Sequence, residues 1–352
     1  MTTRAGLRSK LQLSSSAPTK TFVLDVHTND PDSYLAELVS PSRPIPTEDA
    51  SLFEVNLPSG DFFIDQLGGR FWSFHTDMPM KSARGYLNER VSQRRDLDWV
   101  WLPSQHLRRA AMSGSARGIR TGFRGERLLG AEAGTSRLNL QAFGSEAGGV
   151  LEYLARSDEY RSAVSLDSIQ VLVGDSDEGW LNEGVGRLGN FQASGESLEL
   201  HFQFVRSVVA RYSALVALLE DKAIAWEPFD SSGEERGGRL VGAPVTIAFS
   251  REVPDMERFV DELFACRVPF RLWGIPEIAD GVAAVDAVDL HVGHRLRMDI
   301  GPTWMRVYLE RGACGNTVAR LVSNLQHRFD SALEIVDSEL NAAFSADAST
   351  PT

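Results

Sequence analysis

Two consecutive stretches of the sequence, residues 136–222 and 238–344, share one order of predicted elements: a strand, a helix, several antiparallel strands and a long helix. The clearest of these elements is a helix beginning after Ser197, where apolar residues recur at spacings of three and four. An antiparallel sheet has two faces, and the helices of such a module cover one of them. The sequence therefore predicts an α+β fold of two tandem modules, each with helices on one face of its sheet.

Residues 21–108 repeat this order less clearly, which leaves a third copy of the module open. The order is similar to the TATA-binding-protein-like or helix-grip topology, and a likeness of topology carries no function. Clusters of glycine, serine and charged residues mark the predicted boundaries. The predicted parts are a flexible basic arm (1–20), an N-terminal α+β module with a basic C-terminal part (21–111), a Gly/Arg-rich loop or linker (112–135), a central α+β module (136–229), a linker (230–238), a C-terminal α+β module (239–344) and a disordered tail (345–352).

Composition excludes several classes of protein. With 43% hydrophobic and 24% charged residues, the 352-residue chain fits a soluble globular protein rather than a collagen-like or disordered one. No segment approaches the roughly 18 consecutive apolar residues of a membrane span, and the first 21 residues lack the apolar block of a secretory signal. The chain has two cysteines, Cys266 and Cys314, too few for a disulfide framework and wrongly spaced for zinc. We expect a cytoplasmic protein with no membrane partner, and no cofactor is indicated.

Charge is distributed unevenly along the chain, although the net charge is -12. Residues 81–128 contain eleven basic residues against four acidic ones, a local charge of +7, and the first twenty residues add four basic residues and no acid. Such clustering gathers anionic partners onto one face, and guanidinium groups suit phosphate geometry. The predicted contacts to nucleic acid or another polyanion are Arg94, Arg95, Arg108, Arg109, Arg117, Arg120, Arg124 and Arg127.

The motifs of common nucleotide and hydrolase sites are missing from the sequence. There is no phosphate-binding P-loop and no G-x-S-x-G elbow. Gly184-Val185-Gly186 precedes a predicted strand, whereas a dinucleotide site needs the N-terminus of a helix there. Ser104, His106 and Asp98 are close in sequence, but a catalytic triad requires convergence in space, which adjacency does not indicate. No catalytic residue is assigned.

One pair of histidines is the best candidate for metal binding. His291 and His294 flank a predicted hairpin turn, and a nearby carboxylate would complete a ligand set. The carboxylates considered are Asp286, Asp289 and Asp299. The alternative is that both histidines simply lie beside an exposed turn, and no metal ligand is assigned.

Aromatic residues near the basic segment have two interpretations. These residues are Phe71, Trp72, Phe74, Trp99 and Trp101. Exposed, they would stack on bases; buried, they would fill a core, which is the usual place of large aromatic side chains and the favoured interpretation.

Three hypotheses for function remain. The preferred one is a non-catalytic binding or assembly protein, in which the arginines contact nucleic acid or another polyanion. In this hypothesis the apolar stripe from Val318 to Leu340 associates with a protein partner or a second copy. The second hypothesis is a hydrolase, metal-dependent in one version, with an unrecognised site. The third is a structural subunit whose basic and acidic regions pair between copies.

Overall fold

A computed structural model describes residues 3–67, 69–130, 135–175, 179–228 and 238–345. Helices and antiparallel sheets are both present, so the predicted α+β class is confirmed. Of the predicted linker over 230–238 only Gly238 is described, and of the predicted tail over 345–352 only Ser345; the rest of both lies outside the described residues.

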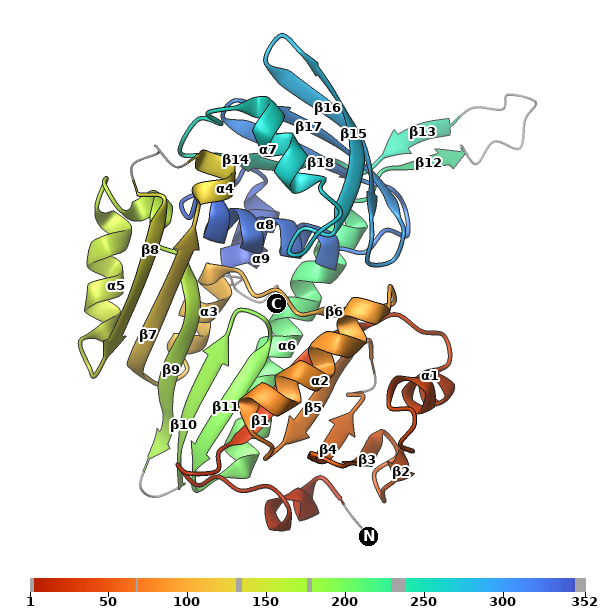
Figure 1. Cartoon of the computed structure of the whole chain (residues 1–352), viewed down its shortest axis with the longest axis vertical. Coiled ribbons are helices and arrows are strands. Elements are labelled where there is room, and N and C mark those ends of the chain that lie inside the picture. The colour runs from red at the N-terminus through yellow and green to blue at the C-terminus, as the bar shows by residue number, and fades with distance from the viewer. Residues whose placement is uncertain (1–2, 68, 131–134, 176–178, 229–237, 346–352) are drawn as a thin grey trace. The chain divides into compact units, whose positions relative to one another are not determined.

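Three consecutive segments each run through a strand, a helix, antiparallel strands and a helix (Figure 1). The first contains β1 (Thr19–Val26), α1 (Pro31–Leu38), β2 (Ile45–Pro46), β3 (Leu52–Leu57), β4 (Gly60–Asp65), β5 (Phe71–Thr76) and α2 (Met80–Gln93). The second contains β8 (Arg137–Phe143), α5 (Ala147–Arg156), β9 (Leu166–Asp175), β10 (Gly179–Gly186), β11 (Asn190–Gly195) and α6 (Leu198–Asp221). The third contains β14 (Val245–Ala248), α7 (Met256–Leu263), β15 (Leu272–Ala279), β16 (Val282–Asp289), β17 (Arg295–Gly301), β18 (Trp304–Leu309) and α8 (Asn316–Arg328).

Shorter elements flank and connect these segments. A 3-10 helix, η1 (Ala5–Ser9), precedes the first. Between the first and second lie β6 (Leu97–Trp99), α3 (Ser104–Ala111), β7 (Ser115–Arg124) and α4 (Glu126–Leu129). The 3-10 helix η2 (Arg161–Ala163) follows α5, and the strands β12 (Ala225–Pro228) and β13 (Gly238–Val241) follow α6. The chain continues after α8 with β19 (Glu334–Ile335) and α9 (Ser338–Ser345).

Contacts group the chain into two compact units. Unit 1 consists of Met1–Arg120, Gln141–Val150 and Leu166–Ala210, and unit 2 of Thr121–Leu140, Leu151–Ser165 and Arg211–Thr352. The predicted module boundaries divide the chain differently, because they follow the sequence. The physical reason is strand pairing: β11 of the second segment pairs with β1 of the first, so one sheet contains strands from both.

Unit 1 is organised around a sheet in the order β2-β3-β4-β5-β1-β11-β10-β9-β7-β8. Every residue of β1 and β5 is buried. On one face Phe22 and Leu24 of β1 share a core with Leu87 of α2, and on the other Phe63 of β4 packs with Phe202 of α6. Helices therefore pack against both faces of this part of the sheet, α2 on one and α6 on the other.

Two predicted segments have more structure than the sequence analysis expected. Within the predicted flexible arm, Leu7 and Leu11 are buried. Their apolar side chains pack in one core with residues of β3, β4 and α6. The predicted Gly/Arg-rich loop contains β7 and α4. In β7, Ile119, Thr121 and Phe123 alternate as buried residues, and this period of two is hidden in the sequence by the glycines and arginines between them. Residues 131–134 lie outside the described part.

Unit 2 contains a six-stranded sheet in the order β15-β16-β17-β18-β14-β19. Alternate residues of its strands, such as Val285, Met298 and Val307, are buried in one core with α7 and α8. The other face of β16 to β18 is exposed or half-buried, as the period of two predicts. The apolar stripe from Val318 to Leu340 does not lie on one helix: α8 ends at Arg328, because Phe329 leaves the helical conformation, and α9 begins at Ser338.

The long helix α6 contributes to both cores. Leu198 and Phe202 pack in unit 1, and Leu215 and Leu219 pack in unit 2. By length and composition α6 would be able to cross a membrane, the one such helix among the described residues. Its burial in the two cores is the ordinary situation of a core helix in a globular protein.

Candidate anion-binding site

The eight predicted arginines lie on three elements and one connection. Arg94 and Arg95 follow α2, and Arg108 and Arg109 form the last turn of α3. Strand β7 carries Arg117, Arg120 and Arg124, and α4 carries Arg127. Arg124 and Arg127 belong to unit 2 and the other six to unit 1.

Two of these arginines are already paired with carboxylates. Arg94 forms ion pairs of 3.1 Å with Glu37 and 3.2 Å with Asp96. Its guanidinium also lies over the ring of Tyr34, 4.5 Å from the centroid. Arg127 pairs with Glu262 at 3.1 Å. Charge that is compensated in this way attracts a polyanion less strongly, so Arg94 and Arg127 are weaker candidates than an arginine without such an ion pair.

Arg120 lines a cavity of about 290 Å³ in unit 1. The cavity lies between the first turns of α2, represented by Met80 and Arg84, and the exposed side chains of β9, β10 and β11. Its volume is at the lower end of the range of small-ligand sites, about 300–1,000 Å³. The cavity therefore has room for one small ligand or one unit of a polymer.

Strand register explains why the sheet is hollow at this point. Gly184 of β10 is paired with Gln170 of β9 on one side and with Gln192 of β11 on the other. A Cβ atom on Gly184 would meet its nearest neighbours only at ordinary contact distances of 3.6–3.9 Å. At this position β10 has no side chain, whereas β9 and β11 on either side carry the long side chains of Gln170 and Gln192. The missing side chain leaves a recess in the sheet surface.

Amide side chains surround this recess. Asn182 lies two residues before Gly184 on the same face of β10, and Asn190 covers Gly186, where an added Cβ would come within 2.4 Å of its Oδ1. We call the recess the Gly184 well: its floor is Gly184, and its walls are Gln170, Asn182, Asn190 and Gln192, all of which line the cavity. The well therefore presents hydrogen-bond donors and acceptors on every side.

The charge of the cavity favours anions. Among the described residues its lining contains the guanidiniums of Arg84 and Arg120 and no carboxylate. Helix α2 begins at Met80 on the rim, and the N-terminus of a helix carries a partial positive charge. The side-chain oxygen of Asn182 is shielded from solvent and accepts no hydrogen bond from the described residues. A ligand with an anionic group and an N–H donor would satisfy this lining.

A buried polar network lies on the opposite face of β10. His201 Nδ1 of α6 is 2.7 Å from Glu183 Oε2, and Thr21 Oγ1 of β1 is 2.7 Å from both His201 Nε2 and His75 Nδ1. These side chains are at most 3% exposed. Burial raises the pKa of Glu183, and burial together with the neighbouring His201 lowers the pKa of His75 to about 3.

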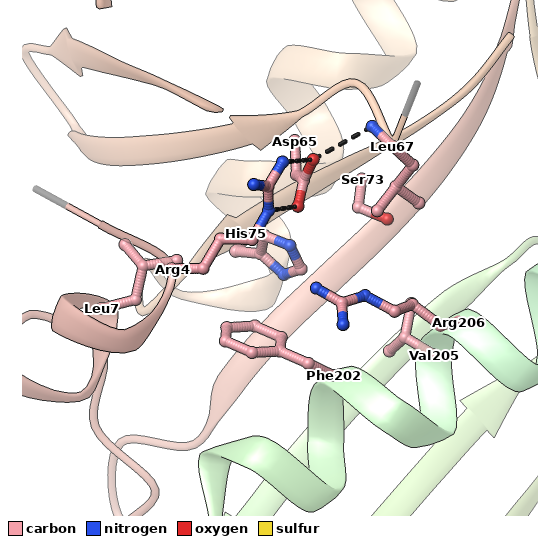
Figure 2. Close-up of a pocket in the computed structure, with 9 residues that line it drawn as sticks. All are labelled: Arg4, Leu7, Asp65, Leu67, Ser73, His75, Phe202, Val205 and Arg206. Atoms are coloured by element: carbon pink, nitrogen blue, oxygen red, sulfur yellow. Dashed lines mark hydrogen bonds and ion pairs between the residues drawn. The ribbon is translucent and has the colours of Figure 1, made fainter. Parts of the chain in front are cut away.

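His75 also borders a second, much smaller cavity in unit 1 (Figure 2). This cavity measures about 10 Å³, room for a single water molecule. Arg4 and Asp65 pair beside it, with Arg4 Nε 2.6 Å from Asp65 Oδ2, and Arg206 closes it from α6. A cavity of this size does not admit an organic substrate.

The carboxylate of Glu183, the imidazole of His201 and the hydroxyl of Thr21 follow one another in the same order as the groups of a catalytic triad. Thr21, however, is fully buried in β1, and its oxygen contacts two imidazole rings. A nucleophile must reach its substrate, which the burial of Thr21 prevents. The network is better explained as a structural link between β1, β5, β10 and α6.

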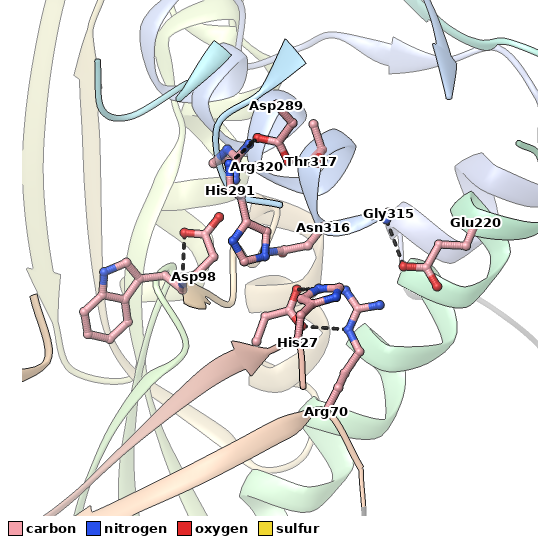
Figure 3. A network of polar contacts seen from close by, with 12 residues as sticks. His27, Arg70, Asp98, Glu220, Asp289, His291, Gly315, Asn316, Thr317 and Arg320 are labelled. Atoms are coloured by element: carbon pink, nitrogen blue, oxygen red, sulfur yellow. Dashed lines mark hydrogen bonds and ion pairs between the residues drawn. The ribbon is translucent and has the colours of Figure 1, made fainter. Parts of the chain in front are cut away.

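The carboxylates considered for a metal site with His291 and His294 do not lie on one face of the sheet in unit 2, although Asp289 accepts a hydrogen bond from His291 N at 3.1 Å. Asp289 faces the core, where its carboxylate accepts hydrogen bonds from Arg320 and Thr317 (Figure 3). Although burial raises the pKa of Asp289, Arg320 and Thr317 together hold it below its usual value. Asp286 and Asp299 lie on the exposed face of the same sheet, across from Asp289. Asp289 is thus a partner of Arg320, and the proposed carboxylates are split between two faces.

The remaining sequence candidates are structural. Asp98 accepts hydrogen bonds from Trp99 N at 2.8 Å and Trp101 Nε1 at 3.3 Å, and the hydroxyl of Ser104 accepts one from Leu166 N at 3.1 Å. His106 is 1% exposed. The five aromatic residues near the basic segment are buried, so the core interpretation is confirmed and base stacking on them is excluded: Phe71, Trp72, Phe74, Trp99 and Trp101.

Comparison with known proteins identifies the family. The profile of the family described as MJECL33-like protein matches residues 8–343. The chain belongs to the MJECL33-like family. A relative named uncharacterized protein MJECL33, from Methanocaldococcus jannaschii, is 24% identical over 354 residues, covering 89% of this chain and 84% of the relative. No solved structure matches the chain. The match to the family covers every residue of the Gly184 well, and neither the family's name nor the relative's name states an activity.

Proposed function

We propose that this MJECL33-like protein is a non-catalytic binding protein that takes a phosphate-bearing ligand, nucleic acid or another polyanion, at the cavity above the Gly184 well. The proposal rests on the charge of the cavity lining. This lining contains Arg84 and Arg120 and, among the described residues, no carboxylate. In a chain of net charge -12, such a site attracts anions that the rest of the surface repels.

The state of the two guanidiniums supports this proposal. Both side chains are exposed, and within the described part of the chain neither has an ion-pair partner. Arg84 comes from α2 and Arg120 from β7, so the fold brings together charges from distant parts of the sequence. Planar guanidiniums form paired hydrogen bonds with phosphate oxygens, which suits them to this ligand.

Location and association are part of the same proposal. We place the protein in the cytoplasm, consistent with Cys266 and Cys314 both being outside any disulfide. Association through the C-terminal stripe rests on Val336, which is 62% exposed, because Val318 and Leu325 are buried in the core of unit 2. Light scattering of Val336→Glu tests it: loss of an oligomer supports the contact, and an unchanged mass refutes it.

Fluorescence anisotropy with a labelled single-stranded 12-mer tests the binding function. We expect binding at about 50 mM salt that weakens as salt rises, with log K falling by about 0.7 per neutralised phosphate for each unit of log salt. Replacing Arg84 and Arg120 by alanine should weaken binding and reduce this slope by about 1.4. The control is Arg156→Ala, since this arginine is 82% exposed on α5 and does not line the cavity. Absence of binding at about 50 mM salt, or equal slopes for the double variant and the native protein, refutes the proposal.

A further inference from the structure

We propose that the Gly184 well takes an unpaired nucleobase, so that the ligand unit is a nucleotide whose phosphate contacts Arg84 and Arg120. This inference rests on the proposed function, to which it adds the planar group beside the phosphate. The nucleobase inference is based on the shape and the hydrogen-bonding groups of the well, whereas the proposed function is based on the charge of Arg84 and Arg120.

The shape of the well suits a flat ring. Its floor is the backbone of β10 at Gly184, and the strands on either side, β9 and β11, are two strand spacings apart, about 9.5 Å. Along β10 the side chains of the same face recur only every second residue, about 6.8 Å apart. A planar group can therefore lie against the peptide backbone, with its edges toward the side chains of the walls.

The walls carry the groups that read base edges. Gln170 and Gln192 each offer a carbonyl acceptor and an NH2 donor from opposite sides. Glutamine and asparagine amides form paired hydrogen bonds with bases, and single-stranded bases are recognised by such contacts. The shielded oxygen of Asn182, without a donor among the described residues, would accept a ring N–H or an amino group. A polyanion of phosphates alone has no donor for this oxygen.

The site also selects a single strand. In a duplex the bases are stacked, and their pairing edges are occupied, whereas a recess in a protein surface receives a base that has left the stack. The lining of the cavity supplies Met80 as an apolar contact beside the two guanidiniums. Phosphate and base of one nucleotide would thus meet different groups of the same cavity.

Gly184→Val separates base recognition from charge. An added Cβ has room, since its nearest neighbours are at 3.6–3.9 Å, and valine is favoured in strands, so we expect no loss of Tm. The valine methyls fill the well and leave both arginines in place. The control is Gly85→Ala in α2, where an added Cβ meets nothing within 4 Å.

The probes are a labelled single-stranded 12-mer and an abasic 12-mer with the same number of phosphates. We expect the native protein and Gly85→Ala to prefer the 12-mer with bases by about fivefold or more, the low end for one paired base contact. Gly184→Val should remove this preference and leave the affinity for the abasic strand within about twofold. Equal affinities of the native protein for the two strands would overturn the nucleobase inference and leave the anion-binding proposal standing.

A second variant keeps the inference testable if Gly184→Val does not fold. Gln170 and Gln192 are both exposed, so replacing them by leucine removes the amides at little cost to the fold. If Gly184→Val lowers the Tm, the double leucine variant must lose the preference for bases. Retention of that preference in a folded Gly184→Val protein, or in the double variant, overturns the inference. Failure of both strands to bind the native protein at about 50 mM salt overturns the proposed function as well.

Discussion

Glu183 and Gly184 are consecutive residues of β10 that face opposite sides of the sheet. The Glu183 carboxylate lies 2.7 Å from His201 Nδ1 in the buried network, and Gly184 is the floor of the well. One strand therefore serves the proposed ligand site on one face and an anchor to α6 on the other. Substitutions on the network side should change stability, and substitutions on the well side should change binding.

Thr21→Val tests the network side. Valine keeps the shape of the side chain and removes the hydroxyl that lies 2.7 Å from His75 Nδ1 and from His201 Nε2. We expect the free energy of unfolding to fall by about 1–3 kcal/mol, because buried polar groups lose a partner. Urea unfolding measures this change, with Thr246→Val on half-buried β14 as the control. Equal effects of the two substitutions would contradict a structural role for the network.

The titration of His75 gives a prediction for pH. Burial and the neighbouring His201 lower its pKa from 6.5 to about 3, so the folded chain holds it neutral. Between these values the unfolded chain binds a proton that the folded chain does not. The free energy of unfolding therefore decreases as the pH falls through this window, by up to about 1.4 kcal/mol per pH unit.

Urea unfolding of the native protein and His75→Gln from pH 7 to pH 4 measures this contribution. Burial raises the pKa of Glu183, which therefore contributes the opposite slope above pH 4.5, its ordinary value. Because Glu183 is present in both proteins, the difference between their slopes isolates His75. We expect the variant to lose less stability on acidification; parallel curves would show that His75 does not titrate as described.

Local periodicity predicted many elements of the fold but few parts of the site. The helix predicted after Ser197 is α6, which begins at Leu198, because its apolar residues recur at spacings of three and four. Strand β7 was missed, because glycines and arginines obscured the alternation of Ile119, Thr121 and Phe123. The glycine and arginine content of this segment predicted a loop, whereas the burial of Ile119, Thr121 and Phe123 stabilises a strand.

The site depends on register, which periodicity does not supply. Gln170 and Gln192 are far apart in sequence, and only their common pairing with Gly184 makes them neighbours across the well. Of the two cavity guanidiniums, Arg120 was among the predicted contacts and Arg84 was not. A signal was nevertheless present: the parts of three successive strands that line the cavity carry polar residues or glycine at every second position, as in Ser168 and Gln170 of β9.

Arg320→Met tests the buried pair in unit 2. Arg320 and Asp289 are at most 1% exposed, and Arg320 Nε also donates to the carbonyl of Phe270 at 2.9 Å. Removing the guanidinium leaves a buried carboxylate without its charge partner, which costs about 3–5 kcal/mol of unfolding free energy. Arg297→Met is the control, because Arg297 is 58% exposed beside Asp299 and such pairs contribute about 0–1 kcal/mol. A loss of less than about 1 kcal/mol in Arg320→Met would show that Asp289 is solvated or protonated instead.

Gly184→Ala and Gly186→Ala test whether the well is kept open at the expense of stability. Glycine inside a strand costs about 0.5–1 kcal/mol relative to alanine, and an added Cβ fits at Gly184, with neighbours at 3.6–3.9 Å. Gly184→Ala should therefore raise the free energy of unfolding by about this amount. At Gly186 the same atom would come within 2.4 Å of Asn190 Oδ1 and displace that side chain, so Gly186→Ala should give no such gain. Urea unfolding of both variants measures the difference, and a loss of stability in Gly184→Ala would mean that the well is filled by the protein itself.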